Sequence, residues 1–306
     1  MVIAGETHGS RSGEPRLTVG IIGAGRVGSV LGAALARAGH TVTGVSAVSD
    51  ASVRRAGALL PGVPLLDPDA VAARCALLLL AVPDDSLGAL VAGLAATGAV
   101  RPGQLVVHTS GRHGTAVLAP AAACGALTLA VHPAMTFTGD GVTDLARIAG
   151  ACFAITAEEA LLLVGEALVL EMGGEAVVVA EEARPLYHAA LAHGAGHLVT
   201  LVSQALDALV AAGVAAPARV LAPLASAALD GALRAGDAAT TGPVVRGDAG
   251  TVTTHLAVLG ESQPATVEAY RALARATTDR AIARGRLRAR DAGELQDVLG
   301  LTGTVA

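Results

Sequence analysis

A chain of 306 residues exceeds what one small hydrophobic core supports, so two domains are expected. The formal net charge of −5, without a basic patch interleaved with aromatic residues, argues against a nucleic-acid partner. All 21 basic residues are arginine, which excludes a lysine Schiff base, a lysine general acid and a P-loop lysine.

The apolar content of 53% raises the question of a membrane. Two long windows, residues 113–139 and 185–206, lack charged residues, but proline, histidine and glycine interrupt them. We therefore expect no membrane span. The three cysteines lie far apart in apolar surroundings and are expected to be buried free thiols, which suits a reducing cytoplasm. Residues 1–16 are polar and are predicted to be a disordered tail and not a signal peptide.

The most informative stretch is Gly-x-Gly-x-x-Gly at residues 23–28. Residues 17–22 before it read as a buried parallel strand, and residues 29–38 after it read as a helix. A strand, a glycine-rich turn and a helix in this order are typical of a dinucleotide site. The alternative is a glycine-rich turn that binds nothing.

Each residue of the turn has an expected role. Gly23 permits the tight turn, Gly25 lets the backbone approach a pyrophosphate, and Gly28 lets the helix lie close to the strand. Arg26 and Val27 open the helix, so their backbone is expected to contact the cofactor.

The second strand, residues 41–46, bears on the choice of nicotinamide cofactor. Sites that prefer NAD usually end this strand with a carboxylate, whereas Ser46, Ser49 and Arg54 occupy this region here. Hydroxyls and a guanidinium would bind a 2′-phosphate, so NADP is favoured over NAD. Asp50 is expected to cap the following helix. The alternative for Arg54 is a solvated helix face.

Strands and helices alternate along the first half of the chain. Further strands are predicted at residues 63–66 (weak), 75–82, 104–109 and 126–131. The fold class is therefore α/β, with a doubly wound Rossmann-type parallel sheet over residues 17–156 and a smaller all-α domain over residues 157–306.

Ligands of such sheets bind outside the carboxyl ends of the strands. The turn at residues 23–28, Ser46, the pair Val82 and Pro83, Ser110 and His132 all fall on that edge. Val82 and Pro83 are therefore added to the cofactor residues, and Ser110 and His132 to the candidate catalytic residues.

The second domain is expected to be helical from residue 181 onward. The segment 181–210 is apolar nearly all round, which predicts a buried helix. Its middle, residues 193–197, contains two glycines that would let another backbone come close. This predicts helix packing within the domain or across a homodimer.

Few side chains could supply a proton to a substrate. His188 follows Arg184 by one turn and could act as a general acid near neutral pH. Tyr187 is adjacent but points about 100° away on the helix, so one of the two is expected to reach the cofactor. His132 and His188 could instead be buried structural histidines, and Ser110 an ordinary turn residue.

The turn-rich segment 240–248 interrupts the helical domain. Arg246 could clamp a substrate carboxylate, and Asp248 could hold Arg246 or cap the next helix. His193 and His197 share a helix face, as zinc ligands do, but no third ligand is evident. No metal site is expected.

The chain resembles a family of bacterial proteins that join a Rossmann-like domain to a domain called DUF2520, over roughly residues 17–300. The residues that carry the resemblance are 23–28, 81–85, 108–111, 132–133, 187–190 and 241–248. More distantly, the chain is similar to pyrroline-5-carboxylate reductases and β-hydroxyacid dehydrogenases. The resemblance implies an NADP-linked reductase, with 2-dehydropantoate as one candidate substrate.

Two departures from these relatives bear on catalysis. β-Hydroxyacid dehydrogenases use a lysine on the interdomain helix as acid and base, and this chain contains none. Many DUF2520 relatives have an asparagine where this chain has Gly196.

The sequence thus predicts an NADP-dependent oxidoreductase that transfers a hydride to a small carboxylated carbonyl or imine. The alternative is a nucleotide-sensing or scaffold protein that retains the Rossmann site without turnover. A reductase linked to cofactor F420 would share the same fold.

Overall fold

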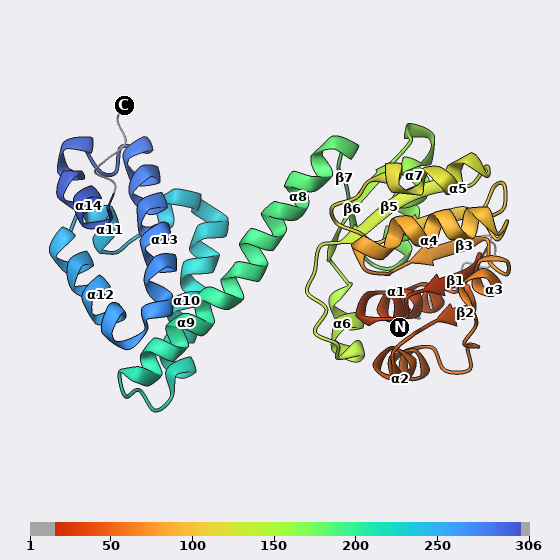
Figure 1. The fold of residues 1–306 in the computed structure, drawn as a ribbon, viewed down its shortest axis with the longest axis horizontal. Coiled ribbons are helices and arrows are strands. Elements are labelled where there is room, and N and C mark those ends of the chain that lie inside the picture. Colours follow the sequence, from red (N-terminus) through yellow and green to blue (C-terminus); the bar gives the residue numbers. More distant parts are fainter. Residues whose placement is uncertain (1–15, 301–306) are drawn as a thin grey trace, which may run out of the picture. The chain divides into compact units, whose positions relative to one another are not determined.

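The computed structural model describes residues 16–300, and it divides into two compact units between Ala192 and His193 (Figure 1). The tail predicted for residues 1–16 lies outside the described residues, apart from Arg16. Each unit is described below by itself.

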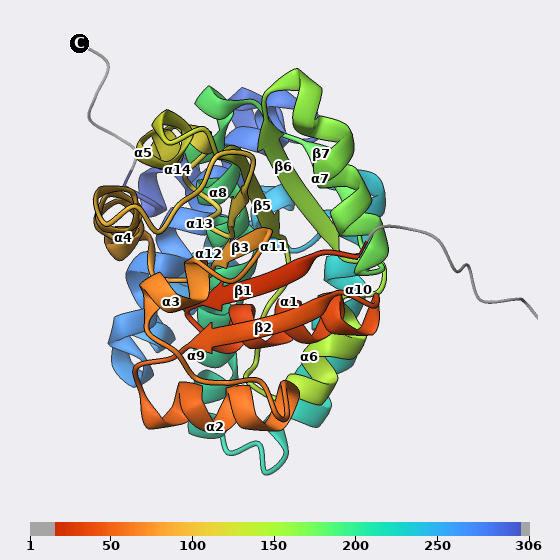
Figure 2. The same cartoon turned by 90° about the vertical axis from the view of Figure 1, so that its right-hand side faces the viewer.

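The first unit is built on one sheet of seven strands in the order β2-β1-β3-β4-β5-β6-β7. The strands are β1 (Thr18–Ile22), β2 (Thr41–Ser46), β3 (Leu77–Leu80), β4 (Leu105–His108), β5 (Leu127–Pro133), β6 (Cys152–Ala157) and β7 (Glu175–Val178). Figure 2 shows β1 and β2 side by side. The chain leaves β1 for β2 on one side and then returns to β3 on the other, so the strand order reverses beside the end of β1. In doubly wound sheets this is where ligands bind.

Helices cover both faces of the sheet and make two separate cores. The helices are α1 (Arg26–Arg37), α2 (Asp50–Leu59), α3 (Pro68–Ala72), α4 (Asp84–Ala96), α5 (Ala119–Ala123), α6 (Gly141–Arg147) and α7 (Glu159–Glu171), with a short 3-10 helix η1 (Thr115–Leu118) before α5. Leu77 and Leu79 of β3 pack in the core with α1, α2, α6 and α7, and Leu78 and Leu80 pack with α3, α4 and α5. This alternation explains why central strands read as continuous apolar runs. The predicted α/β doubly wound class is confirmed.

Three details of the first unit differ from the sequence predictions. Residues 63–66 form only one bridge, between Val45 and Leu65, because Pro64 has no N–H to donate to a ladder. Strand β6 runs antiparallel to β5, so the sheet is mixed. The predicted domain boundary after residue 156 lies too early, because β7 pairs with β6 and α7 packs on both.

The second unit is helical around a small core. It contains α9 (His197–Ala211), α10 (Pro217–Ala235), η4 (Gly236–Ala239), α11 (Pro243–Arg246), α12 (Ala249–Ser262), α13 (Pro264–Ala283), η5 (Ala289–Asp291) and α14 (Gly293–Val298). The buried apolar residues lie on α11 to α14 and their connections: Val245, Val252, Ala274, Ala281, Leu287, Ala292, Leu295 and Leu299. Neither α9 nor α10 has a buried residue.

The segment predicted as one buried helix consists of η2 (Glu181–Ala183), α8 (Arg184–Leu191), a π-helical turn at Ala192–Gly196 and α9. Residues 181–211 are long and apolar enough to cross a membrane by length and composition, and none of their most apolar window is buried. The prediction of burial is therefore wrong for this single chain. Only Arg184 of α8 is buried.

Two smaller expectations are also corrected. Among the cysteines Cys75 is buried, Cys124 is half-buried and Cys152 is exposed, so burial of all three was wrong. A Cβ at Gly194 or Gly196 would meet nothing within 4 Å, so the close packing predicted at these glycines is not found within the described second unit. The alternative, packing across a homodimer, stays a prediction.

Candidate functional site

The glycine turn is shaped by close backbone contacts at two of its three glycines. Gly23 has φ +94°, and a Cβ there would lie 2.5 Å from the Ala81 carbonyl oxygen. A Cβ at Gly28 would lie 2.3 Å from the Gly23 carbonyl oxygen. A Cβ at Gly25 would approach no atom closer than 4.0 Å, so Gly25 faces open space. These are the features of a cradle that a phosphate could fill.

The N-terminus of α1 opens onto this space. Gly25 is the N-cap and makes no side-chain capping bond, and the first turn contains no acidic residue. The first backbone N–H groups, including those of Arg26 and Val27, are therefore available to an anion and carry the positive end of the helix dipole. The neighbouring strand end contributes Val82, whose methyl lies 3.0 Å from the Cβ position of Gly23, and Pro83 caps α4.

The end of β2 closes the other side of the turn. The Ser46 carbonyl oxygen accepts from the N–H groups of Gly23 and Ala24, each at 3.0 Å. Ser49 caps α2 by accepting from the Ser52 N–H, and Asp50 is the first helical residue. The prediction that Asp50 caps this helix is therefore wrong, because a serine one residue earlier completes a capping box with Ser52. Arg54 lies exposed on α2.

A cluster of polar rings lies at the ends of β4 and β5. The Tyr187 hydroxyl on α8 and Nδ1 of His132 are hydrogen bonded at 2.9 Å, with the rings nearly perpendicular. The ring of His188 also meets that of His132 edge-on, with 6.1 Å between centroids. A Cβ at Gly111 would lie 2.6 Å from His188 and 2.9 Å from His132, so both rings lie against this glycine. Tyr187 and His188 both contact His132. That one of the two reaches the cofactor stays a prediction.

Arg184 fixes α8 to the sheet. Its guanidinium is fully buried and donates to the carbonyl oxygens of Ala130 and Ala154, each at 3.0 Å, and of Ser110 at 3.3 Å. Its Nε donates to the Thr156 hydroxyl at 2.7 Å. The acceptors therefore come from β5, β6 and the loop after β4. Among the described residues, no carboxylate forms an ion pair with Arg184, so its direct partners are the dipoles of carbonyl groups and one hydroxyl.

Burial and this cation set the protonation states of the cluster. Burial, followed by the charge of Arg184, lowers the pKa of His132 to about 4, so His132 is neutral at pH 7. Burial raises the pKa of Tyr187, against the opposing pull of Arg184. The guanidinium carbon lies 5.9 Å from the centre of the Tyr187 ring. The cluster thus holds a neutral imidazole and a protonated phenol beside a buried positive charge.

The loop after β4 is held by a second buried histidine. His108 is fully buried, its Nε2 lies 2.8 Å from the Gly114 carbonyl oxygen, and its Nδ1 accepts from the Ser110 N–H at 3.1 Å. Burial lowers the pKa of His108 to about 4. The Ser110 hydroxyl accepts from the His113 N–H at 3.2 Å and is itself buried. Ser110 therefore already has a structural partner.

The remaining predicted residues lie in the second unit. Arg246 is exposed at the end of α11. Asp248 caps α12 by accepting from the Thr251 N–H at 3.0 Å, as one of its two predicted roles required. His193 and His197 are exposed and hydrogen bonded to each other at 3.0 Å, and no group of three metal-binding side chains occurs among residues 16–300.

Sequence reasoning missed the roles of Arg184, Gly111 and His108. A buried arginine that binds strand carbonyls leaves no periodic pattern, because its acceptors are backbone atoms. The signal for Gly111 was its position directly after the polar end of a strand. His108 ends a continuous apolar run on β4, and this position at the end of a central strand could have indicated a buried histidine.

Comparison with known families agrees with the two-part sequence pattern. A Rossmann-like domain matches residues 4–133, and DUF2520, a domain of unknown function, matches residues 151–277. The resemblance to Rossmann-like and DUF2520 proteins is therefore confirmed. No curated protein sequence matches the chain.

Solved structures share the fold over nearly the whole chain. A Bacteroides fragilis protein, BF3122, provisionally designated an NADP oxidoreductase, has a TM-score of 0.73 and 21% identity, covering 86% of this chain and 98% of that one. An imine reductase from Myxococcus stipitatus in complex with NADP+ has a TM-score of 0.61 and 20% identity, covering 88% and 94%. A reductive aminase from Aspergillus terreus, solved with NADPH and ethyl levulinate, has a TM-score of 0.60 and 20% identity, covering 94% and 100%. At these identities the likeness is one of fold.

Proposed function

We propose that this chain, which joins a Rossmann-like domain to a DUF2520 domain, is an NADP-dependent oxidoreductase that reduces a small carbonyl or imine compound. The observation that carries the proposal is the His132–Tyr187 pair, a proton source at the same sheet edge as the glycine turn. The imine reductase and the reductive aminase described above, which share the fold, are solved with NADP+ and NADPH.

The cofactor fits the residues of the first unit. The open space at Gly25 and the uncapped first turn of α1 would receive the pyrophosphate, as the helix dipole favours anions there. Ser46, Ser49 and Arg54 would face the 2′-phosphate, and Val82 and Pro83 would line the neighbouring strand end. Bound NADPH would supply the hydride.

The protein would supply the proton. When neutral His132 carries its proton on Nδ1, it donates to the Tyr187 oxygen and leaves the tyrosine O–H free to face a substrate. As the carbonyl carbon or imine carbon gains a hydride, the O–H bond of Tyr187 breaks and its proton passes to the substrate oxygen or nitrogen. The resulting phenolate is stabilised by His132 and by the charge of Arg184.

The other predicted catalytic residues have supporting roles in this proposal. His188 contacts the substrate beside His132, while Ser110 shapes the loop on which the rings lie. A small 2-oxo acid such as 2-dehydropantoate, or a carboxylated cyclic imine, is the candidate substrate. The exposed guanidinium of Arg246, in the second unit, stays a separate candidate for carboxylate binding. We place the enzyme in the cytoplasm, because its reducing conditions suit the free thiols of Cys75, Cys124 and Cys152.

The decisive measurement is NADPH oxidation against a panel of 2-oxo acids and cyclic imines, with each acid matched by its amide. Turnover on at least one substrate, with kcat/KM lower for its amide, is the expected result. Oxidation of reduced F420 but not NADPH, with fluorescence titration showing tight F420 binding, would contradict the cofactor assignment.

A second function, nucleotide sensing without turnover, has two observations in its favour. The chain contains no lysine, so the acid–base residue of β-hydroxyacid dehydrogenases is missing, and Gly196 replaces the asparagine of many relatives. Submicromolar NADPH binding with no turnover on any substrate of the panel would favour this function over the reductase.

We also propose a homodimer formed through the helical unit. Both α9 and α10 expose large apolar side chains in the single chain: Val199, Leu201, Val210, Val220, Leu224, Leu229 and Leu233. A face of this kind is typical of an association surface.

A further inference from the structure

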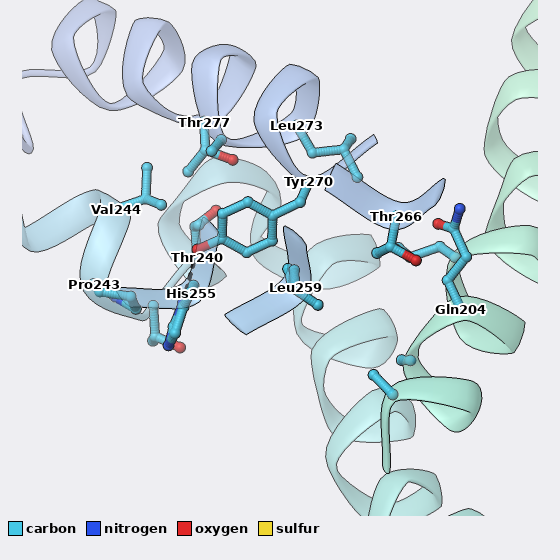
Figure 3. A pocket seen from close by; sticks show the side chains of 15 residues that line it. Gln204, Thr240, Pro243, Val244, His255, Leu259, Thr266, Tyr270, Leu273 and Thr277 are labelled. Carbon is cyan, nitrogen blue, oxygen red and sulfur yellow. Dashed lines mark hydrogen bonds between the residues drawn. The ribbon is translucent and has the colours of Figure 1, made fainter. Parts of the chain in front are cut away.

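The second unit contains a concave cavity of about 430 Å³ that none of the proposed catalytic residues lines. It lies between α9, α12, α13 and the segment around Thr240, and Figure 3 shows the side chains that line it. Its volume falls in the range of about 300–1,000 Å³ that small-molecule sites occupy. All its lining residues belong to one unit.

The lining carries no formal charge. Apolar side chains such as Leu201, Leu259 and Leu273 make most of its surface, and hydroxyls of Thr266 and Thr277 are interspersed. No aspartate, glutamate or arginine is among the lining residues. A charged ligand would therefore lose its hydration without meeting a carboxylate or a guanidinium.

One hydrogen-bonded pair of polar side chains lies at the wall of the cavity. The Tyr270 hydroxyl and Nδ1 of His255 are hydrogen bonded at 2.8 Å, with the rings nearly perpendicular, and Figure 3 shows them at the cavity wall. Burial raises the pKa of Tyr270, so it stays a neutral phenol. When the Tyr270 hydroxyl donates to Nδ1 of His255, its oxygen can still accept a hydrogen bond from a ligand. When His255 instead carries its proton on Nδ1 and donates to Tyr270, the Tyr270 hydroxyl can donate to a ligand.

We infer that this cavity is a binding site for an uncharged, largely apolar small molecule with one hydrogen-bonding group that faces Tyr270 and His255. The apolar walls take the carbon skeleton of the ligand, and the phenol–imidazole pair fixes its polar end. The inference does not depend on hydride transfer or on a bound nucleotide.

The amino-acid composition provides a local reporter for this site. The chain has no tryptophan and two tyrosines, so a Tyr187→Phe protein has Tyr270 as its single tyrosine fluorophore. We would titrate this protein, free of nucleotide, with cyclohexanone and with 4-oxocyclohexanecarboxylate. The two probes share a ketone that quenches phenol emission, and they differ in the carboxylate.

Cyclohexanone is expected to quench the Tyr270 fluorescence saturably. The affinity for 4-oxocyclohexanecarboxylate should be lower by about tenfold or more. In the same background, Ala208→Phe fills the cavity and should abolish saturation, whereas Ala272→Phe, on the exposed side of α13, should not. If Ala208→Phe does not fold, Ala205→Phe lines the same cavity from the same helix.

Three results would overturn the inference. These are absence of saturable quenching by the neutral ketone, equal affinity for both probes, and insensitivity to the cavity-filling variants. Loss of probe binding as the protein concentration rises would assign the cavity to a second copy of the chain instead. Because the Tyr187→Phe protein lacks the proposed proton donor, none of these outcomes bears on the reductase proposal.

Discussion

The hydroxyl of Tyr187 and Nδ1 of His132 lie 2.9 Å apart, although 55 residues separate them in the chain. The pair exists because Arg184, three residues before Tyr187, fastens α8 to the carbonyl groups of β5 and β6. The proposed chemistry therefore depends on a buried cation that forms no hydrogen bond with the Tyr187 hydroxyl or the His132 imidazole.

Loss of the Tyr187 hydroxyl should affect chemistry more than binding. Tyr187→Phe keeps the ring but removes the proton, so kcat should fall by about 100-fold or more, with the Kd for NADPH within twofold of the parent value. Steady-state kinetics and calorimetric titration would test this. A Tyr270→Phe protein, changed at the other tyrosine, is the matched control, and an equal loss of kcat in both would argue against the role of Tyr187.

Substitutions at Gly25 and Gly28 should have different effects, the first on NADPH binding and the second on stability. Gly25→Val places a side chain in open space at φ −77°, so the fold should persist while NADPH affinity falls by about 100-fold. Gly28→Val would drive a side chain into the Gly23 carbonyl and should lower the free energy of unfolding by several kcal/mol. Thermal unfolding and nucleotide titration of both variants would check this. Unimpaired NADPH binding by Gly25→Val would exclude this turn as the phosphate site.

The preference for NADP should depend on Arg54. Removing a guanidinium that pairs with a phosphate should weaken NADPH binding by about ten- to 100-fold and leave NADH binding unchanged, since only NADPH carries the 2′-phosphate. Arg54→Ala would be compared with Arg37→Ala, an exposed arginine at the end of α1. If the parent protein bound NADPH and NADH with nearly equal Kd values, the assignment of Ser46, Ser49 and Arg54 to the 2′-phosphate would be contradicted.

Stability should decline on mild acidification because of His108. Its folded pKa of about 4 lies below its ordinary value of 6.5, so below pH 6.5 the unfolded chain binds a proton that the folded chain does not. Between pH 7 and pH 5 this fully buried group should cost about 2 kcal/mol of the free energy of unfolding, and His132 should add a smaller loss.

Urea unfolding followed by circular dichroism at both pH values would measure the decline. His108→Gln should lower the free energy of unfolding at pH 7 and should make it less dependent on pH. His193→Gln, at an exposed position, should leave the pH dependence unchanged. A pH dependence that is equally steep in His108→Gln would show that other groups cause it.

Disruption of the apolar face of α10 should dissociate the proposed homodimer. Leu224 is 69% exposed in the single chain, and Leu224→Glu would bury a carboxylate in the interface. Light scattering after gel filtration should report a dimer for the parent and a monomer for this variant. Leu163→Glu, at a 76% exposed position on α7, should remain dimeric. A monomeric parent would refute the dimer directly.

The sequence was most informative where local pattern and burial agree. Strand β1, the glycine turn and α1 follow from an apolar run, three glycines and a helix-forming stretch. Gly23 is required by its contact with the adjacent strand and Gly28 by its contact with Gly23. The exposed course of residues 181–211 could not be foreseen, since an apolar helix surface predicts burial without identifying what covers it. The cluster around His132 combines residues from three distant segments, and only the sheet order brings them together.

The position of Arg184 has a consequence for any shortened form of this protein. The carbonyl groups that it satisfies belong to Ser110, Ala130 and Ala154, which are synthesised 30 to 74 residues earlier. A chain that ends at residue 156 would contain the nucleotide turn but leave that edge of the sheet without its donor. During synthesis, the first unit can reach its final form only after α8 has left the ribosome, and an independently folding fragment should therefore extend to residue 192.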